Sequence, residues 1–77
     1  NPVRSSTTIA FDIAQPCRAT LRVYNQLGEQ VAVLADEEVL PGTYRSSFDA
    51  GGLPEGVYHY VLTAGARTIT RSVVVVR

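Results

Sequence analysis

Leu53-Pro54-Glu55-Gly56-Val57-Tyr58 is the stretch of this chain that decides its fold. The spacing Leu-x-x-Gly-x-Tyr is typical of a tyrosine corner, in which a tyrosine near the start of a strand hydrogen-bonds through its hydroxyl to the backbone a few residues upstream. Such a corner holds the crossover between the two sheets of an immunoglobulin-like sandwich. We therefore predict that Leu53, Gly56 and Tyr58 form a structural corner.

Away from this corner, apolar and polar residues alternate with a period of two, which is the pattern of half-buried β-strands. Turn-forming residues separate the alternating runs. We predict strands at residues 8–13, 19–23, 29–35, 43–49, 57–63 and 68–76. The acidic run Asp36-Glu37-Glu38 is expected to lie in a loop, and no segment keeps a helical period. The pattern predicts an all-β fold, an immunoglobulin-like antiparallel β-sandwich of about seven strands.

Length and charge limit what the chain can be. Its 77 residues suffice for one domain, and we place the end of a linker at 1–6 and the domain at 7–77. Seven arginines balance seven acidic residues, and this zero net charge argues against nucleic acid or anionic lipid as the main partner. Because the sequence has no methionine, we expect it to be a fragment of a longer protein. No run approaches the ~20 apolar residues of a membrane-spanning helix, and Cys17 has no second cysteine with which to form a disulfide.

The residue types of catalytic and metal sites are sparse. His59 falls on the opposite strand face from Tyr58 and Tyr60, is expected to be exposed, and has no second histidine or cysteine at ligand spacing. No nucleophile motif accompanies it. The adjacent carboxylates at 36–38 do not converge on one centre as calcium ligands would. We therefore predict that the chain is not an enzyme and has no cofactor and no metal site.

The end of the chain, Val73-Val74-Val75-Val76, combines high β-propensity with no charge and no proline. This composition is typical of an aggregation-prone strand, and Arg71 and Arg77 flank it as charged gatekeepers. If both faces of such a strand are apolar, it is either covered on both sides or offered to a partner. We therefore expect direct recognition of a partner at this end of the chain.

In these features the chain resembles the type A C-terminal sorting domains of the type IX secretion system. Such domains end many secreted proteins of the Bacteroidetes and their relatives. The resemblance covers essentially all 77 residues. Each segment is a weak signal alone, whereas their order and spacing are specific. The segments that carry it are Asn1-Pro2, Thr7-Thr8-Ile9-Ala10-Phe11, Leu21-Arg22-Val23-Tyr24-Asn25-Gln26-Leu27-Gly28, Val31-Ala32-Val33-Leu34, Leu40-Pro41-Gly42-Thr43-Tyr44, Phe48-Asp49-Ala50, the corner from Leu53 to Tyr58 and the final stretch from Arg71 to Arg77.

The resemblance implies a secretion signal. A sorting domain of this kind directs the cargo domains that precede it in the same chain, such as a secreted hydrolase, through the periplasm and across the outer membrane to the cell surface or the medium. Its partners are the translocon, which recognises the folded domain, and a sortase-like peptidase that commonly removes it. By resemblance, the residues that the translocon recognises are Gly56, Tyr58, Arg71, Val73, Val74, Val75, Val76 and Arg77.

The chain departs from the family pattern at two positions. The lysine that is usual near Arg71 is absent, and Ser72 adds no second charge. Asn25 replaces the more frequent aspartate of the Val-Tyr-Asp run. We expect this second change to affect a turn cap more than recognition.

Two other functions fit the same sequence. A structural or carbohydrate-binding immunoglobulin-like module of a secreted enzyme would bind polysaccharide through Tyr24 or another exposed aromatic residue, although such modules often present tryptophan and this chain has none. A scaffold domain similar to the immunoglobulin-like part of the flagellar hook-capping protein would lie away from a chain terminus. Whether the full-length gene product stops at Arg77 distinguishes these alternatives.

Overall fold

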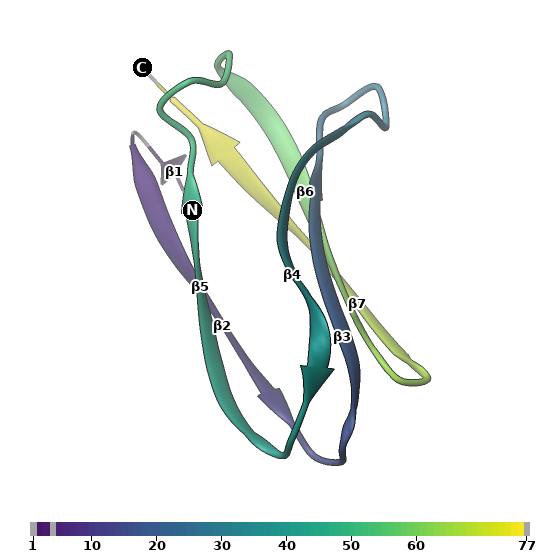
Figure 1. Cartoon of the computed structure of the whole chain (residues 1–77). Helices are drawn as coiled ribbons and strands as arrows, with labels where there is room; N and C mark the ends of the chain where they lie inside the picture. The colour runs from purple at the N-terminus through teal and green to yellow at the C-terminus, as the bar shows by residue number, and fades with distance from the viewer. Residues whose placement is uncertain (1, 4, 77) are drawn as a thin grey trace.

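The computed structural model describes residues 2–3 and 5–76 of the chain. These residues form two β-sheets that face each other, with no helix among them (Figure 1). The strands are β1 (Pro2–Val3), β2 (Ser6–Ile13), β3 (Cys17–Tyr24), β4 (Gln30–Val39), β5 (Gly42–Asp49), β6 (Gly56–Ala64) and β7 (Arg67–Val75). The prediction of an all-β antiparallel sandwich is confirmed, because six strands of eight to ten residues make up the two sheets and the two-residue β1 only extends one edge.

The two sheets differ in width. One has five strands in the order β1-β7-β6-β3-β4, and the other contains only β2 and β5. Neighbouring strands are antiparallel except for β1, which runs parallel to β7 and pairs Pro2 with Val74 and Val3 with Val75. Among the described residues, β2 therefore has no strand neighbour on its second side.

The main core lies between the sheets and is built from alternate residues of each strand. Phe48 of β5 packs in one cluster with Leu21 and Val23 of β3, and these three side chains are almost completely buried. Val73 and Val75 of β7 belong to the same cluster. Truncating a large buried side chain to alanine typically costs about 2–5 kcal/mol. The end of the chain is thus part of the core.

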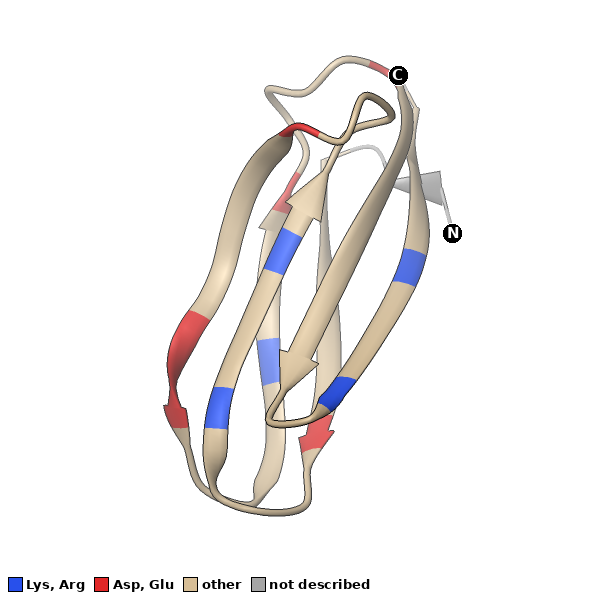
Figure 2. Ribbon diagram, turned by 90° about the vertical axis from the view of Figure 1, so that its right-hand side faces the viewer, with Lys and Arg blue, Asp and Glu red and all other residues tan. Residues whose placement is uncertain are grey.

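The acidic run at 36–38 lies in β4, so the prediction of a loop there is wrong. Arg18 of β3 compensates two of the three carboxylates. Its Nη2 lies 2.8 Å from Oδ1 of Asp36, and its Nη1 lies 3.8 Å from Oε1 of Glu38. Val39 ends the strand with a buried side chain. Arg18 on the neighbouring strand and the buried Val39 make an extended conformation of the acidic run favourable. Figure 2 shows the acidic stretch beside a basic position of the neighbouring strand.

Residues before position 7 take part in the fold. β1 pairs with the end of β7, and Ser6 is the first residue of β2. The carbonyl of Ser5 accepts a hydrogen bond from the backbone N–H of Ala50 at 2.7 Å. The boundary between a linker at 1–6 and a domain at 7–77 stays a prediction, and these contacts lie on its linker side.

Candidate functional site

The loop between β5 and β6 carries the corner motif. The hydroxyl of Tyr58 donates a hydrogen bond to the carbonyl oxygen of Pro54 at 2.6 Å, and the side chain is buried. Gly56, the first residue of β6, has a φ of +155°, a conformation that residues with a side chain rarely adopt. Leu53 packs against the main core from the loop. This is the geometry of a tyrosine corner, and it fixes the direction in which the chain enters β6.

A second arrangement of the same kind, which we did not predict, begins β5. The hydroxyl of Tyr44 donates a hydrogen bond to the carbonyl oxygen of Leu40 at 2.5 Å, again four residues upstream. Gly42, with a φ of +154°, is the first residue of β5, as Gly56 is of β6. The signal in the sequence is the repeated Gly-x-Tyr spacing of Gly42-Thr43-Tyr44.

The corner and the tail form one unit in the sheet. Gly56 of β6 pairs in register with Val75 of β7, and Tyr58 pairs with Val73. The two segments of the family pattern are therefore direct neighbours across the β6–β7 hairpin. A change in the corner would alter the position of the tail, because the pairing of β6 fixes the register of β7.

Strand β7 presents different valines to the core and to solvent. Val73 and Val75 point inward and are 4% and 0% exposed, whereas Val74 lies on the outer face and is 37% exposed. The tail is therefore covered on one face only. Val76, just beyond the strand, is half-buried.

The remaining residues of the expected recognition set differ in accessibility. Arg71 is exposed, Gly56 is half-buried, and Tyr58 is buried. Arg77 lies outside the described residues. Within β6 and β7, Arg71 and Val74 are thus the members of the set that expose their side chains most to solvent.

Asn25 caps the turn between β3 and β4. Its Oδ1 accepts hydrogen bonds from the backbone N–H groups of Leu27, at 2.9 Å, and Glu29, at 3.0 Å. Its Nδ2 donates to Oε1 of Glu29 at 2.8 Å. An aspartate could accept the first two bonds but could not donate the third. The departure from the family pattern therefore lies in a turn cap that also uses the amide nitrogen.

The outer face of the five-stranded sheet carries the histidine and Tyr24. His59 is half-buried rather than exposed as we expected, and it pairs in register with Tyr24 of β3 and Ser72 of β7. The Oγ of Ser72 lies 3.4 Å from Nδ1 of His59. Tyr24 is half-buried, and the hydroxyls of Tyr44 and Tyr58 are engaged with the backbone. This arrangement gives no specific support to a carbohydrate platform.

No grouping of metal-ligating side chains is found in the part of the chain that the structure describes. No three His, Cys, Asp or Glu residues there are placed to hold a metal ion. Nor does any helix within residues 2–3 and 5–76 have the length and hydrophobicity needed to cross a membrane. The distinctive features of the described chain are structural corners and an accessible last strand.

These features define a small β-sandwich domain with two tyrosine corners and a last strand that is partly exposed to solvent. A family model described as a secretion system C-terminal sorting domain matches residues 1–76. The chain belongs to this family, the C-terminal sorting domains of the type IX secretion system, so the resemblance seen in the sequence is confirmed. The family is one of sorting signals and not of catalysts. No curated protein and no solved structure matches the chain.

Proposed function

We propose that the chain directs a larger cargo protein, formed by domains that precede it in the same polypeptide, through the periplasm to the outer-membrane surface or the medium. Membership of the family makes the chain a C-terminal sorting signal for type IX secretion, which implies export and interaction with the secretion machinery. The observation that carries the proposal is the match over residues 1–76, together with the register that joins the corner to the tail. A secreted hydrolase is the cargo class that the resemblance suggests.

The proposal gives the residues of the motif two different tasks. Tyr58, Val73 and Val75 act through folding, since their side chains are buried. Gly56 supplies the backbone conformation that starts β6. Their part is to hold β7 in place so that the translocon can recognise it.

The direct contacts belong to the accessible part of the last strand. Arg71 and Val74 expose a charged and an apolar side chain on opposite faces of β7. The family resemblance adds Val76 and Arg77 to the residues that the translocon recognises. The second partner, a sortase-like peptidase, would act on the connection between the cargo and the domain.

A reporter fusion tests this function. A periplasmically exported reporter is joined to the intact 77-residue domain and expressed in a host with a working type IX system and in the same host without its translocon. We expect reporter at the surface or in the medium only in the first host. Equal amounts of reporter outside the cells of both hosts, or no reporter outside the cells of either host, would contradict the proposal.

Deleting residues 72–77 is a poor first test. The deletion removes Val73 and Val75 from the main core, so it would abolish folding and recognition together. Substitutions on the accessible residues separate these two effects.

A further inference from the structure

Strand β7 has a free edge along most of its length. β1 pairs only with Val74 and Val75, so residues 67–73 have no strand neighbour on that side among the residues that the structure describes. β2 of the opposite sheet has a free side as well. Unpaired backbone N–H and C=O groups along such edges are a template for an added strand.

Two cavities lie beside these two edges, and the larger one is also lined by residues 14–17 and 64–66 at one end of the sandwich. One of about 420 Å³ and another of about 290 Å³ share four lining residues, so they are parts of one groove. The shared residues are Asp12 of β2, Leu62 of β6, and Arg67 and Ile69 of β7. On the β2 side, Ile13 lines the first and Phe11 the second. We call this space the β2–β7 groove, lined by Phe11, Ile13, Leu62, Arg67, Ile69 and Arg71. An incoming strand at the edge of β7 would place alternate side chains in it.

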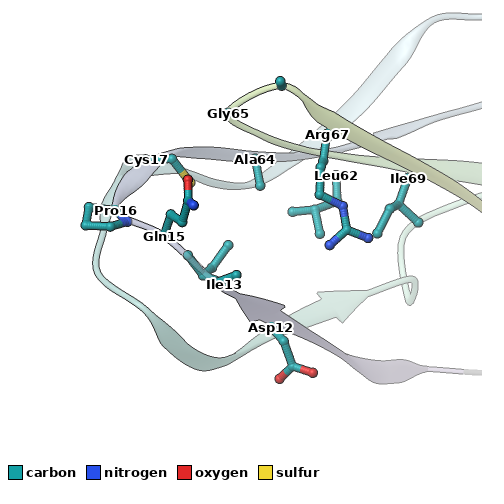
Figure 3. Close-up of a pocket in the computed structure, with 12 residues that line it drawn as sticks. Asp12, Ile13, Gln15, Pro16, Cys17, Leu62, Ala64, Gly65, Arg67 and Ile69 are labelled. Carbon is teal, nitrogen blue, oxygen red and sulfur yellow. The ribbon is translucent and has the colours of Figure 1, made fainter.

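The charges of the groove follow a simple pattern. Arg67, Ile69 and Arg71 alternate along β7 and line the groove, with the apolar residue between the two arginines. Neither arginine forms an ion pair within the described part of the chain. In Figure 3, Arg67 and Ile69 point into the space between the sheets. The edge therefore presents the sequence positive, apolar, positive.

The one carboxylate in the lining does not neutralise this pattern. Oδ1 of Asp12 accepts a hydrogen bond from the hydroxyl of Thr43 on the neighbouring strand at 2.8 Å. Figure 3 shows the Asp12 side chain pointing away from the cavity. The arginines of β7 thus remain available to a negatively charged partner.

The same pattern disfavours a second copy of the chain at this edge. If two β7 edges paired antiparallel about Ile69, Arg67 of one copy would lie opposite Arg71 of the other, twice in the same dimer. Like charges directly opposite each other across strands are destabilising. Acidic side chains of an incoming strand, placed opposite Arg67 and Arg71, would instead form two favourable cross-strand pairs.

We propose that the β2–β7 groove binds an extended peptide segment whose inward face reads acidic, apolar, acidic, and that the translocon supplies this segment. The segment adds to the edge of β7 through backbone hydrogen bonds, its two carboxylates pair with Arg67 and Arg71, and its apolar residue packs on Ile69 and Leu62. The translocon as the source of the segment rests on the proposed secretion function, whereas the binding of such a segment does not. Since the pattern is symmetric, it fits either strand direction.

A synthetic peptide tests the binding. The probe is the end-blocked peptide Thr-Glu-Thr-Val-Thr-Glu-Thr, titrated into the ¹⁵N-labelled 77-residue chain and followed by NMR at low ionic strength. We expect shift changes to concentrate on residues 67–73 and on Phe11 and Leu62. Two control peptides should each bind at least about tenfold more weakly. A peptide with lysine in place of both glutamates loses the charge pairing with the arginines. A glutamate peptide with N-methylated backbone amides loses the hydrogen bonds to the strand edge.

Charge reversal provides the matched variants. In the double variant Arg67→Glu/Arg71→Glu the preference should invert, so that the lysine peptide binds and the glutamate peptide does not. Arg45→Glu is the control, because Arg45 is exposed on β5 and does not line the groove. A merely structural effect of the substitutions would not rescue binding of the opposite peptide.

The outcomes separate this inference from the proposed function. Three results would each overturn the inference. The first is equal binding of the glutamate and lysine peptides to the wild-type chain, and the second is chemical-shift changes confined to the outer face of the five-stranded sheet. The third is a dimer of the unliganded wild-type chain that is lost in the double variant. Export of a reporter fused to the double variant at the wild-type level would remove the translocon as the partner, while the sorting function would stand. Loss of export in the double variant but not in Arg45→Glu, together with inverted peptide preference, would support the whole proposal.

Discussion

Tyr58 of β6 lies directly opposite Val73 of β7, and both side chains are buried in the same core cluster. The corner that begins β6 and the strand that ends the domain are therefore stabilised together. Because Tyr58 is buried, its part in the proposed secretion signal is to stabilise the fold and not to contact the secretion machinery. Its pairing with Val73 helps to hold β7, which carries Arg71 and Val74 on its accessible surface.

Tyr58→Phe should destabilise the domain by about 1 kcal/mol, because it removes a part-buried hydrogen bond and leaves the carbonyl of Pro54 without this donor. For a domain of this size, that loss lowers the melting temperature by about 4–8 °C, measurable by circular dichroism. Tyr44→Phe is the matched variant, and its smaller expected effect follows from the exposure of its hydrogen bond. Equal melting temperatures for wild type and Tyr58→Phe would show that the corner hydrogen bond contributes nothing.

Gly56→Ala should destabilise the domain by roughly 1–2 kcal/mol, since a Cβ is strained at a φ of +155° even though no atom lies within 4 Å of it. Gly52→Ala is the control, because its Cβ would also meet open space and its φ lies outside this range. We expect Gly52→Ala to stay within about 0.5 kcal/mol of wild type in urea unfolding. Similar losses for both variants would contradict the role of the backbone conformation at Gly56.

Asn25→Asp should destabilise the turn between β3 and β4, although aspartate is the more frequent residue in the family. The substitution removes the donor to Glu29 and places two carboxylates side by side, at an expected cost of about 0.5–1.5 kcal/mol. Adding Glu29→Gln should restore most of this stability, since the glutamine amide can donate to the new carboxylate. A double-mutant cycle by urea unfolding with no coupling between the two positions would refute this explanation.

The ion pair of Arg18 with Asp36 should contribute little to the stability of the folded domain. Both side chains are substantially exposed, and such pairs are typically worth about 0.2–1 kcal/mol and weaken with added salt. A double-mutant cycle with Arg18→Ala and Asp36→Ala measures the coupling at low and high salt. A coupling above about 2 kcal/mol would indicate that the pair does more than compensate charge on β4.

Most of the fold was accessible from the sequence because alternation is a direct consequence of one strand face being buried. Five of the six long strands lie within two residues of their predicted bounds, whereas β4 continues four residues beyond its predicted end. The error at 36–38 arose because three adjacent acidic residues indicate a solvated loop unless a cation lies opposite them. The sequence does not state that Arg18 lies across from Glu38, since strand pairing depends on the order and register of the sheet.

The candidate site was predictable in part, and for physical reasons. The family motif identifies Gly56, Tyr58 and the terminal valines, but only the register places Gly56 opposite Val75. The β2–β7 groove could not be predicted, since it depends on which strands remain unpaired at the edges of the two sheets. Arg67 has no special context in the sequence, and only the structure shows that it lines the same cavity as Arg71.

The central claim is that the secretion machinery recognises the accessible part of β7 and does not merely require a folded domain. The most direct test measures the amount of fused reporter that reaches the surface or the medium. Arg71→Glu and Val74→Glu are compared with Arg45→Glu, after thermal melts show that all three variants are folded. We predict that both β7 variants lose most of their export, while Arg45→Glu is exported like wild type. Wild-type export of folded Arg71→Glu and Val74→Glu would contradict the claim.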